Sequence, residues 1–144
     1  MAYVIGRKVV KDTEDFDSYA YGIKIPIQRG PTGYFEQNFT SFEQAKTNLL
    51  NLLQTQQGER VMQPLFGTGL HNLLFEQMDD VEFEFRLQQI ITENVNYWLP
   101  YINIEQIEVE LTDQMKDENK AGLKIQFTVG NEIDLQEITF TIGG

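Results

Sequence analysis

The chain of 144 residues contains no cysteine and a single histidine, His71. Disulfides and thiolate metal sites are therefore excluded, and histidine residues cannot cluster around a metal ion. No apolar run approaches the roughly 18 residues of a membrane-spanning helix, and the N-terminus lacks the apolar core of a signal peptide. We therefore expect a protein that is made in the cytoplasm, stays out of the membrane and needs no metal or other cofactor.

Basic residues are also scarce, with 11 against 22 acidic ones and a net charge of −11. A nucleic-acid surface needs a basic face to displace counterions, so we expect no nucleic-acid partner. Hydrophobic residues make up 41% of the chain and aromatic residues 12%, which is enough for a packed core. A chain of this length corresponds to about one domain.

Residues 1–39 are rich in glycine, proline and aromatic residues, and no helix of useful length fits them. We expect an extended N-terminal arm with little regular structure. Its aromatic side chains could pack on the arm's own domain or on a neighbouring subunit, and both interpretations stay open. They are Tyr3, Phe16, Tyr19, Tyr21, Tyr34, Phe35 and Phe39.

Residues 40–100 show the spacing of helices. Thr40 or Ser41 can cap a helix that ends near Gln56, and residues 68–76 fit a short second helix. Asp79 can cap a longer helix that Pro100 ends. The apolar stripes of the two long helices are Phe42, Ala45, Leu49, Leu50, Leu52 and Leu53, then Phe83, Leu87, Ile90, Ile91, Val95 and Trp98.

From Tyr101 onward apolar residues alternate with polar ones, as in strands. A one-residue slip after Ile104 predicts a bulge, residues 112–120 form a polar loop, and a second slip falls near Gln136 in the last strand. We expect an α+β fold, in which two main helices and a short one pack on a C-terminal antiparallel sheet and residues 40–144 form one domain. Its last two strands contain Leu123, Ile125, Phe127 and Val129, then Ile133, Leu135, Ile138, Phe140 and Ile142.

No catalytic constellation emerges from the acidic residues. A glycosidase needs two carboxylates, one of which holds its proton, and Glu59 and Glu76 are the best placed. Arg60, however, favours the ionised form of Glu59, so a structural role is preferred in which Glu59 and Arg60 pair and hold backbone groups of the turn. A calcium loop from Asp117 fails because Thr128 stands where a bidentate glutamate is required. We therefore predict that the chain is not an enzyme.

The last strand ends almost at the C-terminus, with no element after it to cover the sheet edge. An open edge offers unpaired N–H and C=O groups to another chain, and only Lys124, Glu132 and Glu137 stand nearby as deterrents. Two interpretations are open. The N-terminal arm could cover the edge, or a partner could add a strand to it.

The connection between the two long helices has a distinctive composition. It reads Leu-Leu-x-Thr-x-x-Gly-Glu-Arg-x-x-x-Pro-x-Phe-Gly-x-x-Leu over residues 52–70, followed by Leu74-Phe75-Glu76. Gly58 can end the first helix, and Pro64 prevents it from continuing. Within this central turn the residues Gly58, Glu59, Arg60, Pro64, Phe66 and Gly67 resemble the baseplate wedge family of contractile phage tails. That family includes the sheath initiator, and some members carry a "tail lysozyme-like" label.

The resemblance covers roughly residues 40–142 and implies a structural subunit of the tail baseplate in the virion, assembled in the host cytoplasm. Six copies would dock on other wedge subunits, and the C-terminal strands would template the first ring of tail sheath protein by strand addition. The sheath-binding residues would be Leu123, Ile125, Phe127, Val129, Leu135, Ile138, Phe140 and Ile142. The alternative is a peptidoglycan-cleaving tail lysozyme that uses Glu59 and Glu76. Similar proteins occur in bacterial contractile secretion systems, but the long arm favours a phage tail.

One departure from the family concerns wedge docking. Many members carry Glu-Pro-Arg at the end of the long helix, where this chain has Leu99-Pro100-Tyr101. Pro100 preserves the end of the helix, but both charges are lost. Docking here would rest on Trp98, Leu99, Pro100 and Tyr101 through apolar burial, which makes the wedge partner harder to identify.

Overall fold

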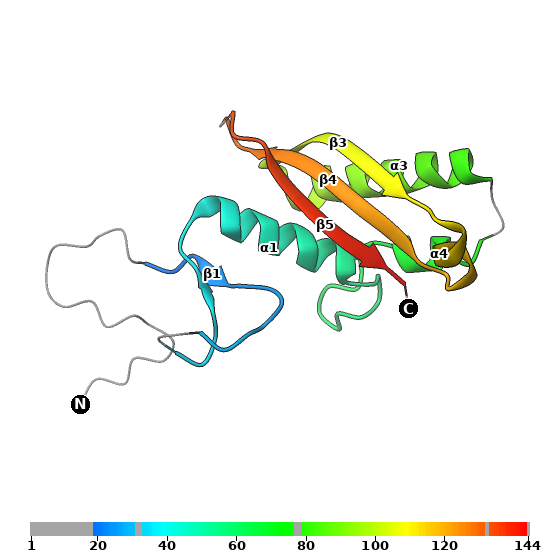
Figure 1. Cartoon of the computed structure of the whole chain (residues 1–144). Coiled ribbons are helices and arrows are strands. Elements are labelled where there is room, and N and C mark those ends of the chain that lie inside the picture. The colour runs from blue at the N-terminus through cyan, green and yellow to red at the C-terminus, as the bar shows by residue number, and fades with distance from the viewer. Residues whose placement is uncertain (1–18, 31–32, 77–78, 132, 144) are drawn as a thin grey trace, which may run out of the picture. The chain divides into compact units, whose positions relative to one another are not determined.

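The computed structural model describes residues 19–30, 33–76, 79–131 and 133–143. The chain divides after Leu50 into two compact units, which are described separately (Figure 1). The division falls inside helix α1, which runs from Ser41 to Gln54. The other elements are β1 (Gly22–Ile23), β2 (Gln37–Asn38), α2 (Leu70–Leu73), α3 (Asp80–Trp98), β3 (Ile102–Glu110), α4 (Asp113–Asp117), β4 (Ala121–Val129) and β5 (Gln136–Ile142).

In the first unit, β1 and β2 pair antiparallel, with Gly22 opposite Asn38. Asn38 is fully buried, and its amide nitrogen donates to Gln44 Oε1 at 3.0 Å and to Thr47 Oγ1 at 2.8 Å, which ties β2 to α1. Tyr3 and Phe16 of the predicted arm lie outside the described residues. The other aromatic residues of the arm are exposed, namely Tyr19, Tyr21, Tyr34, Phe35 and Phe39.

The predicted start of α1 is confirmed. The Glu43 amide donates to Thr40 Oγ1 at 3.2 Å, and Glu43 Oε2 accepts from the Phe39 amide at 3.0 Å. This reciprocal pair satisfies main-chain groups that the first turn of a helix leaves free. Of the predicted apolar stripe, Ala45, Leu49, Leu52 and Leu53 are buried, whereas Phe42 and Leu50 are only partly buried.

In the second unit, a three-stranded antiparallel sheet has the order β3-β4-β5. The predicted bulge in β3 is confirmed, because the register shifts between Ile104 and Gln106. Helix α3 contacts β3, and α2 contacts α3 (Figure 1). The fold class is α+β, as predicted. The core of this unit includes Leu70, Leu73, Phe83, Leu87, Ile91, Val95, Ile102, Leu123, Ile125, Phe127, Ile138 and Ile142.

The last strand is shorter than predicted. It starts at Gln136, opposite Phe127, so Ile133 and Leu135 precede it and are 94% and 54% exposed. Buried Ile138 and Ile142 occupy even positions, and a continuous strand would turn odd-numbered Leu135 to the opposite face. The prediction that Leu135 belongs to this strand is therefore wrong.

Three helix predictions also need correction. The predicted polar loop 112–120 contains α4, a helix of five residues whose Lys116 bonds Asp80 Oδ2 at 2.7 Å. The predicted short helix is limited to Leu70–Leu73. Asp79 does occupy the N-cap of α3, but its side chain makes no capping hydrogen bond. The acidic first turn of α3, Asp80 and Glu82, instead favours this end through the helix dipole.

Candidate interaction site

The central turn is a closed loop held by main-chain hydrogen bonds. The Gly58 amide donates to Pro64 O at 2.8 Å, and the Thr68 amide donates to Thr55 O at 2.9 Å. Thr68 is 1% exposed, and its hydroxyl donates to Leu53 O at 3.0 Å. The Gly58–Pro64 bond thereby closes the loop on itself, and Thr68 fastens its far end to Leu53 of α1 and to Thr55.

Glu59 and Arg60 each hold the loop through a different set of partners. Glu59 Oε2 accepts from the Gln56 amide at 3.0 Å. The Arg60 guanidinium lies 3.9 Å from the centre of the Phe66 ring and donates to Asn51 Oδ1 at 3.2 Å. A cation over an aromatic face is stabilised by the ring quadrupole. The predicted Glu59–Arg60 pair is not among the contacts of the described residues, since each of the two side chains binds other groups.

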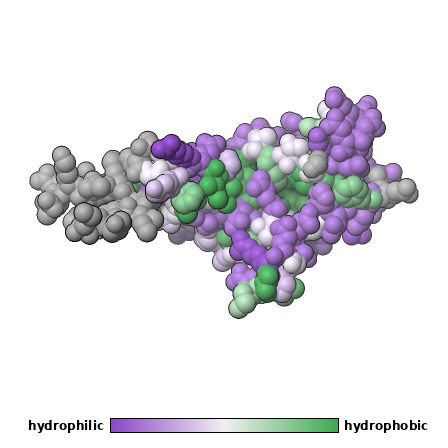
Figure 2. All heavy atoms as spheres, turned by 90° about the horizontal axis from the view of Figure 1, so that it is seen from below, coloured by the Kyte–Doolittle hydropathy of each residue, from purple (hydrophilic) through white to green (hydrophobic). Residues whose placement is uncertain are grey.

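The tip of this braced loop is apolar and faces solvent. Val61, Met62 and Leu65 are 93%, 91% and 74% exposed. We call these three residues the loop tip. Figure 2 shows hydrophobic atoms at the end of a projection on one face of the molecule. The sequence reasoning missed the loop tip, because apolar residues in a turn normally indicate anchors to the core.

An aromatic row connects the loop to the end of α3. Phe66 meets Trp98 edge-to-face with ring centres 5.2 Å apart, and Trp98 meets Tyr97 at 5.0 Å. Of the residues predicted to dock the wedge, Leu99 is 8% exposed and belongs to the core, so its side chain is not offered to a partner. Trp98 is half-buried, Pro100 is exposed and Tyr101 is 40% exposed.

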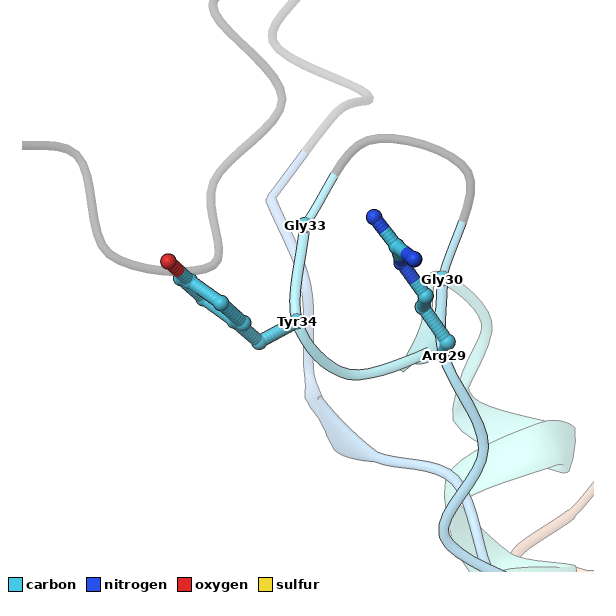
Figure 3. Close-up of a pocket in the computed structure, with 4 residues that line it drawn as sticks. All are labelled: Arg29, Gly30, Gly33 and Tyr34. Atoms are coloured by element: carbon cyan, nitrogen blue, oxygen red, sulfur yellow. The ribbon is translucent and has the colours of Figure 1, made fainter.

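The geometry does not assemble the carboxylate pair of a glycosidase. Glu59 is committed to the loop main chain, whereas Glu76 lines a separate hollow of about 190 Å³. That hollow also contains Asp80, Lys116 and Lys120, and Lys116 bonds Asp80 there. Another hollow, of about 530 Å³, is lined by Arg29, Gly30, Gly33 and Tyr34 and contains no carboxylate among these residues (Figure 3).

Within the described residues, no group of three or more His, Asp or Glu side chains could hold a metal ion. The described helices are all too short or too polar to cross a membrane.

The two edge strands of the sheet, β3 and β5, differ in how regular and how accessible their outer main chains are. At the β3 edge, the bulge at Glu105 breaks the regular ladder, and Gln88 Nε2 of α3 donates to Ile107 O at 3.3 Å. At the β5 edge, no strand among the described residues of this unit pairs outside β5. Residues 136–142 therefore form an open edge.

The strand order bears on which of the predicted sheath-binding residues lie at an open edge. β4 lies between β3 and β5, so its main chain is already paired on both sides. Leu123, Ile125 and Phe127 are at most 1% exposed, and Val129 at the end of β4 is half-buried. Of the predicted set, Ile138, Phe140 and Ile142 lie on β5, the strand at the open edge.

Comparison with known families decides what kind of protein this is. Residues 42–135 match the family model described as "Baseplate wedge protein gp25", which covers more than half of the chain. The chain belongs to this family of baseplate wedge proteins. The resemblance seen in the central turn is thereby confirmed, and the chain is a structural protein of contractile-tail baseplates. No functionally curated protein matches this wedge-family chain.

Solved structures share its fold at low sequence identity. A protein named as a tail lysozyme, from Geobacter sulfurreducens, is 20% identical with a TM-score of 0.62, over 72% of this wedge-family chain and 91% of its own. A chain of the anti-feeding prophage baseplate is 18% identical with a TM-score of 0.55, over 83% of this chain and 82% of its own. At such identities these similarities establish the fold alone.

Proposed function

We propose that this baseplate wedge protein docks on other wedge subunits and uses β5 to start the tail sheath. The observation that carries the proposal is the open edge of β5, residues 136–142. In an antiparallel ladder, alternate residues point their N–H and C=O groups away from the existing partner. β5 therefore offers about half of its main-chain groups to an incoming strand.

A hollow beside the same strand supports this proposal. Phe140, Thr141, Ile142 and Gly143 line it together with Thr68, His71 and the last turn of α1, and its volume is about 150 Å³. Strand addition draws its affinity from main-chain hydrogen bonds and its register from pockets that take alternate side chains. The hollow has room for one side chain of a strand laid along β5, which is the first sheath subunit in this proposal.

Docking on the wedge is assigned to the loop tip and the aromatic row. Val61, Met62 and Leu65 are exposed on a loop that is already ordered, so burying them costs little conformational entropy. Tyr97, 75% exposed, continues the apolar surface beside Trp98. Tyrosine and tryptophan are enriched at the centres of interfaces. Contacts of this kind would replace the charged tripeptide that this chain lacks.

The copy number and setting follow as further parts of the proposal. The anti-feeding prophage baseplate that contains a similar fold is described as six-fold symmetrised. We expect six copies of the present chain in a phage tail baseplate assembled in the host cytoplasm. We also expect no enzymatic role, because Glu59 accepts a hydrogen bond from the loop main chain whereas Glu76 lines a hollow elsewhere.

The absence of cysteine allows a clean test by site-specific cross-linking. Thr139→Cys places a thiol on the solvent face of β5, and Gln89→Cys places a matched thiol on the exposed side of α3. Each variant is labelled with a photoreactive maleimide and incorporated into tails. We expect Thr139→Cys to cross-link to the sheath subunit and Gln89→Cys to do so much less. Cross-linking of both to the same non-sheath protein would contradict the proposal.

A further inference from the structure

Three charged side chains form a row across the solvent face of the sheet. Lys124 Nζ on β4 lies 3.7 Å from Glu108 Oε2 on β3 and 3.4 Å from Glu137 Oε2 on β5. The charges therefore alternate from strand to strand as negative, positive and negative. Opposite charges on neighbouring strands stabilise a sheet and fix which strands lie together.

The sheet as a whole has an excess of negative charge, and Glu137 is the acidic residue on its open edge. The three strands contain one basic residue, Lys124, and four acidic ones, Glu105, Glu108, Glu110 and Glu137. Coulombic attraction from Glu137, and then from Glu108, raises the pKa of Lys124. Because Lys124 lies beside two carboxylates, the negative charge of Glu137 is only partly neutralised within the sheet.

Glu137 is also held in place at that edge. Lys124 and Gln126 both reach its Oε2 atom, at 3.4 and 3.2 Å. Its side chain is 46% exposed, and within the described residues these contacts leave Oε1 for another donor. A carboxylate fixed on one oxygen and open on the other is prepared to accept a hydrogen bond from a cation.

We infer that the strand added to β5 carries a lysine or arginine beside Glu137, so that the alternation of charge continues onto a fourth strand. This inference rests on the proposed strand addition and names the chemistry of the partner. The residues next to the basic one face the opposite side of the sheet, where Ile138 is 6% exposed, and are therefore apolar.

The negative charge of Glu137 also disfavours the addition of strands that carry an acidic residue beside it. A strand with an acidic residue at this position would be repelled by Glu137. β5 has no basic residue of its own, so two copies that paired through this edge would bring together carboxylates without a cation. The net charge of −11 adds to that repulsion.

The test uses tails assembled with full-length variants and the sheath subunit of the same tail as the probe. Glu137→Gln should weaken capture of sheath subunits by isolated baseplates about 3- to 10-fold, and Glu137→Lys by more than about tenfold. Glu84→Gln on the exposed side of α3 removes the same charge elsewhere and should change capture less than about twofold. Exchanging the facing lysine or arginine of the sheath strand for glutamate should restore capture by Glu137→Lys.

Amide hydrogen exchange in residues 136–142 distinguishes strand addition to β5 from the basic residue that the added strand is inferred to carry. Protection of these amides on sheath binding, together with full capture by Glu137→Gln and Glu137→Lys, overturns the inferred basic residue but keeps strand addition. Unchanged exchange in these residues overturns strand addition itself. Protection together with the graded losses and the rescue by charge exchange supports both.

Discussion

Three glycines around the central turn allow a quantitative test of how the loop is held. Gly58 and Gly67 have positive φ angles, 95° and 110°, whereas Gly69 does not. A Cβ at Gly58 or Gly69 would meet no atom within 4 Å, but a Cβ at Gly67 would overlap the Thr55 carbonyl. The three positions therefore separate backbone strain from steric clash within one loop.

The expected costs of alanine follow directly. Gly69→Ala should change the free energy of unfolding by less than about 1 kcal/mol, because neither strain nor clash is introduced. Gly58→Ala should cost about 1–2 kcal/mol from the left-handed backbone. Gly67→Ala should cost about 3–5 kcal/mol, because it adds displacement of Thr55 O and loss of the 2.9 Å bond from the Thr68 amide.

Urea unfolding followed by tryptophan fluorescence measures these costs. Trp98 is the chain's one tryptophan and packs on Phe66, so its emission reports on the second unit and on the loop. The predicted order of destabilisation is Gly69→Ala, then Gly58→Ala, then Gly67→Ala. If Gly67→Ala costs no more than Gly58→Ala, the fastening of the loop to Thr55 is wrong.

Three further predictions concern the same loop. Arg60→Gln should lower the free energy of unfolding by about 1–2 kcal/mol, because the stack on Phe66 and the bond to Asn51 are lost. An unchanged urea midpoint would show that the stack contributes nothing to stability. The double variant Val61→Ser/Met62→Ser should keep its urea midpoint, since both side chains are exposed. It should nevertheless be incorporated into baseplates poorly in competition with wild type. Equal incorporation would show that the loop tip is not part of the docking surface. Purified wild type and Glu59→Gln should both leave cell-wall substrate intact, and clearance by the wild type alone would establish the lysozyme alternative.

Much of the second unit could be predicted because its elements are long enough to show a period. The apolar stripe from Phe83 to Trp98 gave α3, and the phase slip after Ile104 marked the bulge in β3. Helix α4 was missed because five residues contain too little of a helical period to distinguish from a polar loop. The start of β5 was placed too early, at a point that included Leu135, because the sequence does not show where pairing between two strands ends. In the structure, β4 pairs with β5 only as far as Phe127.

The burial of the predicted interaction residues could not be read from the sequence. Sequence alternation shows that β4 and β5 are strands but not that β4 lies in the middle, so buried Leu123 and Phe127 looked available to a partner. Leu99 was named as a docking residue because it stands where many family members carry a charged residue, and it is 8% exposed. The exposure of Val61 and Met62 depends on the fastening of the loop by Gly58, Arg60 and Thr68, which only the folded structure displays.

Amide hydrogen exchange along β5 tests the central claim most directly. Baseplates that contain this chain are compared before and after the first sheath ring is added, with exchange measured in residues 136–142. If the open edge receives a sheath strand, the outward-facing amides of β5 become protected while those paired with β4 change little. Equal exchange in the two states would contradict the claim that the sheath is built on this edge.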